Sequence, residues 1–143
     1  MGLAIEQARL AENAGEVPVG ALLVGASGEV IARGFNQPIS SGDPTAHAEV
    51  VVLREAARLC ANYRLPETTL IVMVEPCLMC AGALLNARVG RLVYGAPEPK
   101  WGAFGSILAV QNLKLNHRIE VISGVREREC GEIMRRFFRN RRT

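Results

Sequence analysis

Short runs of β-branched and apolar residues alternate along this chain with segments rich in helix-forming residues, and this alternation restricts the fold strongly. Five runs have the length and composition of β-strands: residues 19–24, 30–35, 68–74, 91–95 and 119–123. Four longer segments favour helices: residues 3–14, 45–60, 77–87 and 126–139. Strands that alternate with helices are typical of one sheet with helices packed on its faces. We therefore predict an α/β fold.

Turn and cap residues support these boundaries. A Gly-Ala-Ser-Gly turn at residues 25–28 joins the first two strands, which predicts an antiparallel hairpin. Thr45 precedes the second long helix and is expected to cap it. Pro76 stands at the start of the next helix, where proline is tolerated. The run at 68–74 is almost continuously apolar, as in a strand buried on both faces.

The length of 143 residues is that of one domain, so we expect a single domain over residues 1–143. With 49% hydrophobic and 22% charged residues, the chain can form a packed core, which argues against global disorder. No apolar run approaches the roughly 18 residues that a membrane helix needs. Charged residues also occupy the N-terminal region, where a signal peptide would be apolar. We therefore expect a cytoplasmic protein without a membrane partner.

The positive charge of the chain is concentrated at its C-terminal end. Residues 126–143 contain seven arginines and three glutamates, whereas residues 1–125 contain ten basic and eleven acidic residues. An arginine-rich end suggests a phosphate-rich partner. The same charge also describes a solvated, frayed helix end, and on charge alone we favour that interpretation.

Two short motifs carry the candidate chemistry: Thr-Ala-His-Ala-Glu at residues 45–49 and Glu-Pro-Cys-Leu-Met-Cys at residues 75–80. His47, Cys77 and Cys80 form the ligand set of a catalytic zinc site, which uses three protein ligands and leaves a fourth position for water. Each motif opens a predicted helix, whose N-terminal partial charge favours thiolate ligands. Glu49 lies two residues beyond His47 and is the candidate acid/base.

These motifs and several flanking segments resemble the zinc-dependent cytidine deaminase superfamily, and within it the bacterial tRNA-specific adenosine deaminases. The resemblance extends over nearly the whole chain and rests on residues 16–21, 36, 43–49, 62–65, 75–83, 100, 105–106, 116–118 and 137–142. It implies a three-layer α/β/α cytidine-deaminase-like fold, with a five-stranded mixed sheet and helices on both faces. It also implies one zinc ion per chain, a homodimer, and a tRNA anticodon stem-loop as partner.

The resemblance implies hydrolytic deamination of adenosine to inosine at the wobble position of tRNA anticodons. In that reaction a zinc-bound water attacks C6 of adenine and Glu49 shuttles protons. Asn36 would hydrogen-bond the base, the backbone at Ala48 would help to hold it, and Val17 would line the pocket. Contacts to the RNA would come from the 96–105 loop and the C-terminal helix, through Lys100, Phe138, Arg139, Arg141 and Arg142.

Two residues of the 96–105 loop depart from the family's pattern. Glu98 stands between two prolines where the family often has Asp, and Trp101 stands where a small residue is common. The sequence leaves open whether Trp101 stacks on a base or packs within the protein. The sequence also does not decide whether Glu75 supports the residues of the site or is only a charge at the end of a strand.

Three other functions remain to be distinguished. The same chemistry could act on a free base or nucleoside, such as guanine or cytosine. A non-catalytic zinc module would need a fourth ligand from Cys60, Cys130 or His117, although we expect the two cysteines to be buried small residues. A dithiol oxidoreductase would use Cys77 and Cys80 without metal.

Overall fold

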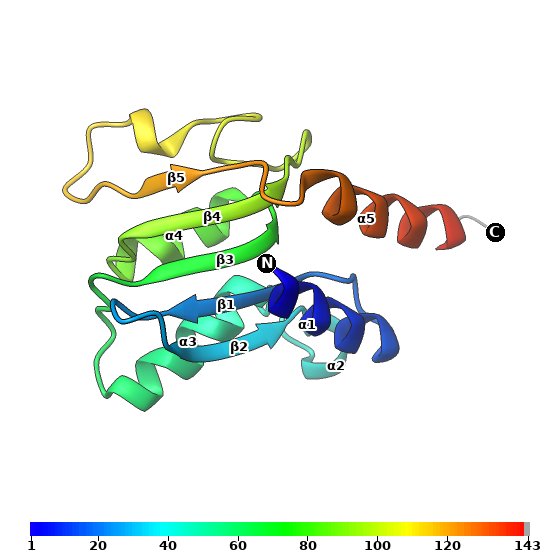
Figure 1. Ribbon diagram of the computed structural model, residues 1–143, viewed down its shortest axis with the longest axis horizontal. Coiled ribbons are helices and arrows are strands. Elements are labelled where there is room, and N and C mark those ends of the chain that lie inside the picture. The colour runs from blue at the N-terminus through cyan, green and yellow to red at the C-terminus, as the bar shows by residue number, and fades with distance from the viewer. Residues whose placement is uncertain (142–143) are drawn as a thin grey trace.

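Five strands form one mixed sheet in the order β2-β1-β3-β4-β5 in the computed structural model, which describes residues 1–141 (Figure 1). The strands are β1 (Gly20–Val24), β2 (Val30–Phe35), β3 (Thr69–Val74), β4 (Arg91–Ala96) and β5 (Glu120–Ile122). Strand β1 is antiparallel to β2 and β3, whereas β3, β4 and β5 are parallel. The predicted strands and the N-terminal hairpin are confirmed.

Helices cover both faces of this sheet. One face packs against α1 (Gly2–Asn13) and α5 (Glu127–Arg141), and the other against α3 (Ala48–Cys60) and α4 (Leu78–Asn86) (Figure 1). The connections contain the short helix α2 (Pro38–Ser41) and the 3-10 turn η1 (Val110–Asn112). The three-layer α/β/α fold implied by the resemblance is therefore confirmed.

Strand β3 contributes to an apolar core on each side of the sheet, because its side chains alternate between the faces. Leu70 and Val72 pack in the core beneath α3 and α4, and Met73 packs in the core beneath α1 and α5. This two-sided burial explains the apolar run of residues 68–74. In β1, Gly20 allows α1 to approach closely, since a Cβ atom there would overlap the carbonyl oxygen of Ala4.

The topology brings two helix N-termini together. Both β2 and β3 are antiparallel to β1, so they point the same way and end at the same edge of the sheet. Helix α3 follows the loop after β2, and α4 follows β3 almost directly. Residues at the starts of α3 and α4 therefore meet at this edge, where open α/β sheets commonly place their sites.

Two local predictions are wrong. Helix α3 begins at Ala48 with His47 as its N-cap residue, because the N–H and hydroxyl of Thr45 donate to Asp43 instead. Cys60 is exposed at the C-terminal end of α3, where the helix no longer contacts the core, whereas Cys130 is buried as expected. Among residues 1–141, no helix combines the length and the apolar composition that crossing a membrane requires.

Candidate active site

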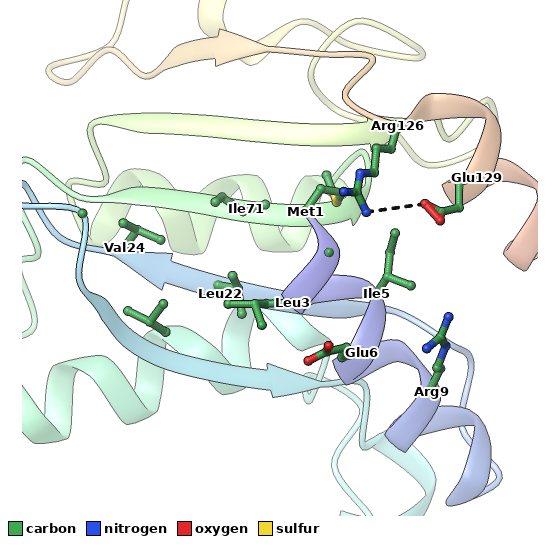
Figure 2. Close-up of a pocket in the computed structure, with 13 residues that line it drawn as sticks. Met1, Leu3, Ile5, Glu6, Arg9, Leu22, Val24, Ile71, Arg126 and Glu129 are labelled. Carbon is green, nitrogen blue, oxygen red and sulfur yellow. Dashed lines mark ion pairs between the residues drawn. The ribbon is translucent and has the colours of Figure 1, made fainter.

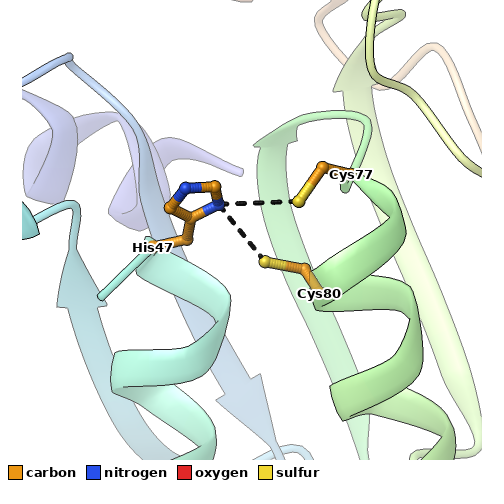
Figure 3. Close-up of side chains that lie close together, drawn as sticks. All are labelled: His47, Cys77 and Cys80. Atoms are coloured by element: carbon orange, nitrogen blue, oxygen red, sulfur yellow. Dashed lines mark hydrogen bonds between the residues drawn. The ribbon is translucent and has the colours of Figure 1, made fainter. Parts of the chain in front are cut away.

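The three predicted zinc ligands converge at the edge where α3 and α4 begin. His47 is the N-cap residue of α3, Cys77 is the N-cap residue of α4, and Cys80 follows in the first turn of α4. The Nδ1 atom of His47 lies 3.6 Å from Sγ of Cys77 and 3.5 Å from Sγ of Cys80 (Figure 3). All three candidate ligand atoms lie within 4.8 Å of one another.

This arrangement fits a single zinc ion. Zinc binds sulfur at about 2.3 Å and histidine nitrogen at about 2.0–2.1 Å, so a tetrahedral ion holds sulfur and nitrogen ligands roughly 3.5 Å apart. The two distances from His47 have this value. Two thiolates and one imidazole are also a donor set that zinc prefers over magnesium or calcium.

The cluster contains no fourth protein ligand within the part of the chain that the structure describes. Cys60 is exposed and Cys130 packs on the opposite face of the sheet. The ring of His117 instead contacts the carbonyl oxygen of Val89 through Nε2 at 2.7 Å. None of the three candidate fourth ligands, Cys60, Cys130 and His117, therefore joins the cluster. A site with only three protein ligands favours a catalytic zinc site with an open position for water.

Hydrogen bonding within the cluster favours a thiolate. The side chain of Cys80 donates to Cys77 and, with the bond from His47, lowers the pKa of the Cys77 thiol to about 4. The same Cys77–Cys80 bond, together with burial, raises the pKa of Cys80. The hydrogen bond to Cys77 raises the pKa of His47. Zinc binds the deprotonated forms of these side chains, so its binding would displace the protons that they hold.

Glu49 is a buried carboxylate beside this cluster. It is the second residue of α3 and is only 4% exposed. Burial raises its pKa from the usual 4.5 to about 7, because the charged form loses its hydration. A carboxyl group whose pKa lies near neutral pH is suited both to accept and to release a proton.

A cavity of about 570 Å³ opens above the cluster. Its lining includes His47, Glu49 and Cys77, and the predicted substrate contacts Asn36, Val17 and Phe138. The volume is ordinary for a small-molecule or nucleoside pocket. The structure therefore brings the candidate chemical groups and the predicted substrate contacts to one cavity, from segments far apart in the sequence.

A second hollow, of about 670 Å³, lies between α1, the outer face of the sheet and the start of α5 (Figure 2). Apolar side chains such as Ile5 and Ile71 line it, and at its rim Arg126 and Glu129 form an ion pair at 3.7 Å. It contains none of the predicted site residues, so the candidate chemistry belongs to the smaller cavity.

Asn36 and Ala48 contact each other. The backbone N–H of Ala48 donates to Oδ1 of Asn36 at 2.8 Å, which satisfies one of the free N–H groups in the first turn of α3. This bond fixes the side chain of Asn36 at the cavity and leaves its amide NH₂ group as a donor. The N–H of Ala48 itself is already engaged by Asn36.

Glu75 organises the loop on the opposite side of the cavity. Its buried carboxylate accepts hydrogen bonds from the backbone N–H groups of Glu98 (3.1 Å), Phe104 (2.9 Å) and Ser106 (3.1 Å), and from the hydroxyl of Ser106. A Cβ atom on Gly102 would overlap this carboxylate, so a glycine is required there. The sequence did not decide between a supporting role for Glu75 and a charge at the end of a strand. In the structure, Glu75 supports the loop.

Glu16 has the same kind of role for the loop that follows Asn36. Its carboxylate is buried and accepts from the N–H of Ile39 at 3.2 Å and from the N–H and hydroxyl of Ser40 at 2.6 and 2.7 Å. Burial alone would raise the pKa of Glu16, but these bonds lower it below the usual value. An acidic residue in an otherwise apolar segment was the sequence signal for this role.

The predicted RNA contacts surround the mouth of the cavity only in part. Phe138 lines it, whereas Lys100 and Arg139 are exposed and do not line it. Arg141 lies over the ring of Phe137 at 4.9 Å and donates to the carbonyl oxygen of Gly15 at 3.0 Å. Arg142 lies outside the described residues.

Replacing Asp43 with asparagine is expected to lower the stability at neutral pH, because Asp43 accepts two bonds from Thr45 and pairs with Arg54 at 2.9 Å. These bonds, led by the Thr45 hydroxyl, lower the pKa of Asp43 from 3.8 to about 2. Because the pKa of Asp43 is lower in the folded state, its charged form stabilises the fold at pH values above its unfolded-state pKa of 3.8. This stabilisation is lost as the pH falls toward 2. Denaturant unfolding between pH 7 and pH 3 should therefore show a shrinking difference between the two proteins. A constant difference would contradict the assignment.

Comparisons with known proteins agree with this geometry. Residues 1–96 match the family model of the cytidine and deoxycytidylate deaminase zinc-binding region. The chain is 48% identical to the tRNA-specific adenosine deaminase of Haemophilus influenzae, over 99% of this chain and 83% of that protein. The tRNA-specific adenosine deaminase of Bacillus subtilis is 46% identical over 97% of this chain and 86% of its own. The chain belongs to the tRNA-specific adenosine deaminase family.

One solved structure agrees with this membership, and a second shares the fold but is named for another substrate. A structure from a study of A-to-I editing by tRNA:A34 deaminases at the wobble position of transfer RNA has a TM-score of 0.90 and 45% identity, and covers 93% of this chain and 96% of that one. Guanine deaminase from Nitrosomonas europaea has a TM-score of 0.80 and 26% identity, and covers 95% of this chain and 81% of that one. In this tRNA-specific adenosine deaminase family member, both zinc motifs fall within residues 1–96, while the loop after β4 and helix α5 lie beyond them.

Proposed function

We propose that this chain hydrolyses adenosine to inosine and ammonia at the wobble position of tRNA anticodons, with an anticodon stem-loop as its substrate. The observation that carries the proposal is the buried carboxylate of Glu49 beside a His-Cys-Cys centre with three ligands, at the cavity that Phe138 of the C-terminal helix also lines. Close sequence identity to tRNA-specific adenosine deaminases over nearly the whole chain supports the choice of substrate.

Each side chain at the cavity has a role in this proposal. When bound, zinc supplies a Lewis acid that makes water a nucleophile at neutral pH. Glu49 accepts a proton from the attacking water at its carboxylate and delivers it to the departing amino group of adenine, so that ammonia leaves. Asn36 donates from its amide to the base, and Val17 contacts the ring. Burial of Glu49 beside the ligand cluster raises the pKa of its carboxyl above the usual value, which favours a group that can hold the transferred proton.

The RNA partner is supported by the residues around the cavity. A base inside a duplex is out of reach of such a site, whereas a loop base can be flipped out at a cost of only a few kcal/mol. Aromatic and basic side chains commonly recognise such loops. Phe138 offers the aromatic contact at the cavity. Beyond the lining of the cavity, the exposed Lys100 and Arg139 and the end of α5 with Arg141 offer charge for the phosphates. Arg142, which the resemblance also implies, lies outside the described residues.

We also propose that a single domain acts as a homodimer in the cytoplasm. Leu78 and Met79 at the start of α4, which line the cavity, are 58% and 37% exposed. The resemblance to the tRNA-specific enzymes supplies the expectation of a second copy.

An assay of inosine formation tests the proposed function. The purified zinc-loaded protein should convert adenosine in the loop of an anticodon stem-loop RNA and leave the same adenosine untouched when the loop is closed into a duplex. Inosine is measured by digestion of the RNA and chromatography of the nucleosides. No inosine from any stem-loop with a wobble adenosine would contradict the proposal.

The same assay with free guanine, cytosine and adenosine tests the second candidate function. The similarity in fold to a guanine deaminase, at 26% identity, is the observation that favours a free base as substrate. We expect the free compounds to react far more slowly than the RNA, because they lack contacts to the residues around the mouth of the cavity. If a free base reacted and the RNA did not, deamination of free bases would replace tRNA deamination as the preferred function.

A further inference from the structure

Trp101 is a large aromatic side chain that the fold leaves in solvent. It belongs to the loop between β4 and η1, lines the mouth of the active-site cavity and is 67% exposed. Within residues 1–141 its indole ring forms no aromatic or cation–π pair and no hydrogen bond. Of the two alternatives that the sequence left open, packing within the protein is therefore excluded for the single chain.

The backbone on both sides of Trp101 is held in place. The N–H of Glu98 donates to the buried Glu75, and the N–H of Gly102 donates to the carbonyl oxygen of Glu98 at 2.8 Å. The N–H of Ala103 donates to the carbonyl oxygen of Pro76 at 2.9 Å, and Gly102 pairs with Cys77 in an isolated β-bridge. The loop is thus fixed to the segment that carries the zinc ligands. An aromatic ring on a fixed backbone loses little further freedom when a ligand binds.

A second aromatic ring lines the same cavity. Phe138 of α5 is 45% exposed, and the buried Phe137 contacts it edge-on with ring centroids 5.2 Å apart. Lys100 stands next to Trp101 in the sequence and is exposed. The mouth therefore combines two aromatic rings with a neighbouring cation, which is the combination that binds single-stranded nucleic acid through base stacking and phosphate contact.

We propose that Trp101 stacks on the base of a nucleotide directly next to the edited adenosine. The proposal rests on the proposed function, because an adenine inserted into the cavity draws its two neighbours in the strand across the mouth. Stacking needs an unpaired neighbour, so Trp101 adds a preference for loops over duplexes. It acts on the flanking nucleotide and takes no part in the chemistry at the zinc ligands.

Trp101 is the only tryptophan of the chain, so its fluorescence reports on this contact alone. Titration with an anticodon stem-loop is expected to quench most of the emission, in parallel with binding measured by the anisotropy of labelled RNA. An abasic site on one side of the edited adenosine should abolish the quenching, and an abasic site elsewhere in the loop should preserve it. Unchanged emission at saturating RNA, or equal quenching with both neighbours abasic in turn, would overturn the proposal.

Two variants separate stacking from general apolar contact. Trp101→Leu is expected to weaken stem-loop binding by roughly 5- to 150-fold, because base–aromatic stacking is lost. Trp101→Phe should restore most of the affinity. Both variants should keep the zinc content and unfolding temperature of the parent, since the side chain is exposed. Equal affinity of the Leu and Phe variants would overturn the stacking role.

The two proposals fail in different ways. Inosine formation without quenching would leave the proposed function standing and remove the role of Trp101. Absence of inosine from every RNA would remove the proposed function itself.

Discussion

Replacing Glu49 with glutamine is expected to lower the rate of inosine formation by about 10²- to 10⁴-fold, the usual contribution of a positioned acid/base. Glutamine has nearly the same size but cannot carry a proton between water and the departing amine. The carboxyl group it replaces is buried beside the ligand cluster, and this burial raises its pKa above the usual value. Single-turnover rates on a stem-loop RNA measure this effect without interference from product release.

Glu55→Gln is the matched control for this variant. Glu55 lies on the same helix, and its carboxylate pairs with Arg58 at the surface at 2.6 Å. Exposed ion pairs contribute little to stability, so this protein should react at the parent rate. Both variants should retain one zinc ion per chain. A Glu49→Gln protein within a few-fold of the parent rate would exclude the acid/base role.

The fold and the metal ligands could be predicted because their signals are local. The composition of consecutive segments predicts the alternation of strands and helices. Cys77 and Cys80 are three residues apart at the start of one helix. His47 lies thirty residues before Cys77, and only the resemblance and the common edge of β2 and β3 join them. Because β2 and β3 run parallel to each other, they end on the same side of the sheet and bring His47 close to Cys77 and Cys80.

The supports of the two cavity walls could not be predicted, because they depend on distant partners. Glu75 accepts from residues 23 to 31 positions later, and Glu16 accepts from residues 23 and 24 positions later. A sequence identifies such residues only as charges at the edges of apolar segments. Their burial and their bonding partners are consequences of the complete fold.

The cap of α3 was predicted wrongly for a related reason. Thr45 has the residue type of an N-cap, but Asp43 is a stronger acceptor two residues away and captures its hydroxyl. Asn36, twelve residues before Ala48, supplies the acceptor for the first turn of the helix instead. This exchange leaves the N-cap position to His47, whose ring then points beyond the helix end toward the two cysteines (Figure 3).

Replacing Cys80 with alanine is expected to reduce the zinc content from one ion per chain to nearly none and to abolish inosine formation. Cys80 is fully buried and is one of only three ligands in the described cluster, so its loss leaves two donors for the ion. Loss of bound metal also lowers stability, because zinc binds the folded state in preference to the unfolded chain. At a free zinc concentration of 100 to 1,000 times Kd this linkage amounts to about 2.7–4.1 kcal/mol. Metal analysis and denaturant unfolding measure the two effects.

Cys60→Ser tests whether the effect belongs to this cysteine or to cysteines in general. Cys60 is exposed at the end of α3 and lies outside the ligand cluster, so its replacement should preserve metal, activity and stability. Adding a chelator to the parent protein should reproduce most of the stability lost in Cys80→Ala, the remainder being the cost of removing a buried sulfur. If Cys80→Ala kept a full complement of zinc, or if Cys60→Ser lost it, the open three-ligand site would be wrong. The chemistry assigned to Glu49 would then lose its basis, because it depends on a fourth position that water can occupy.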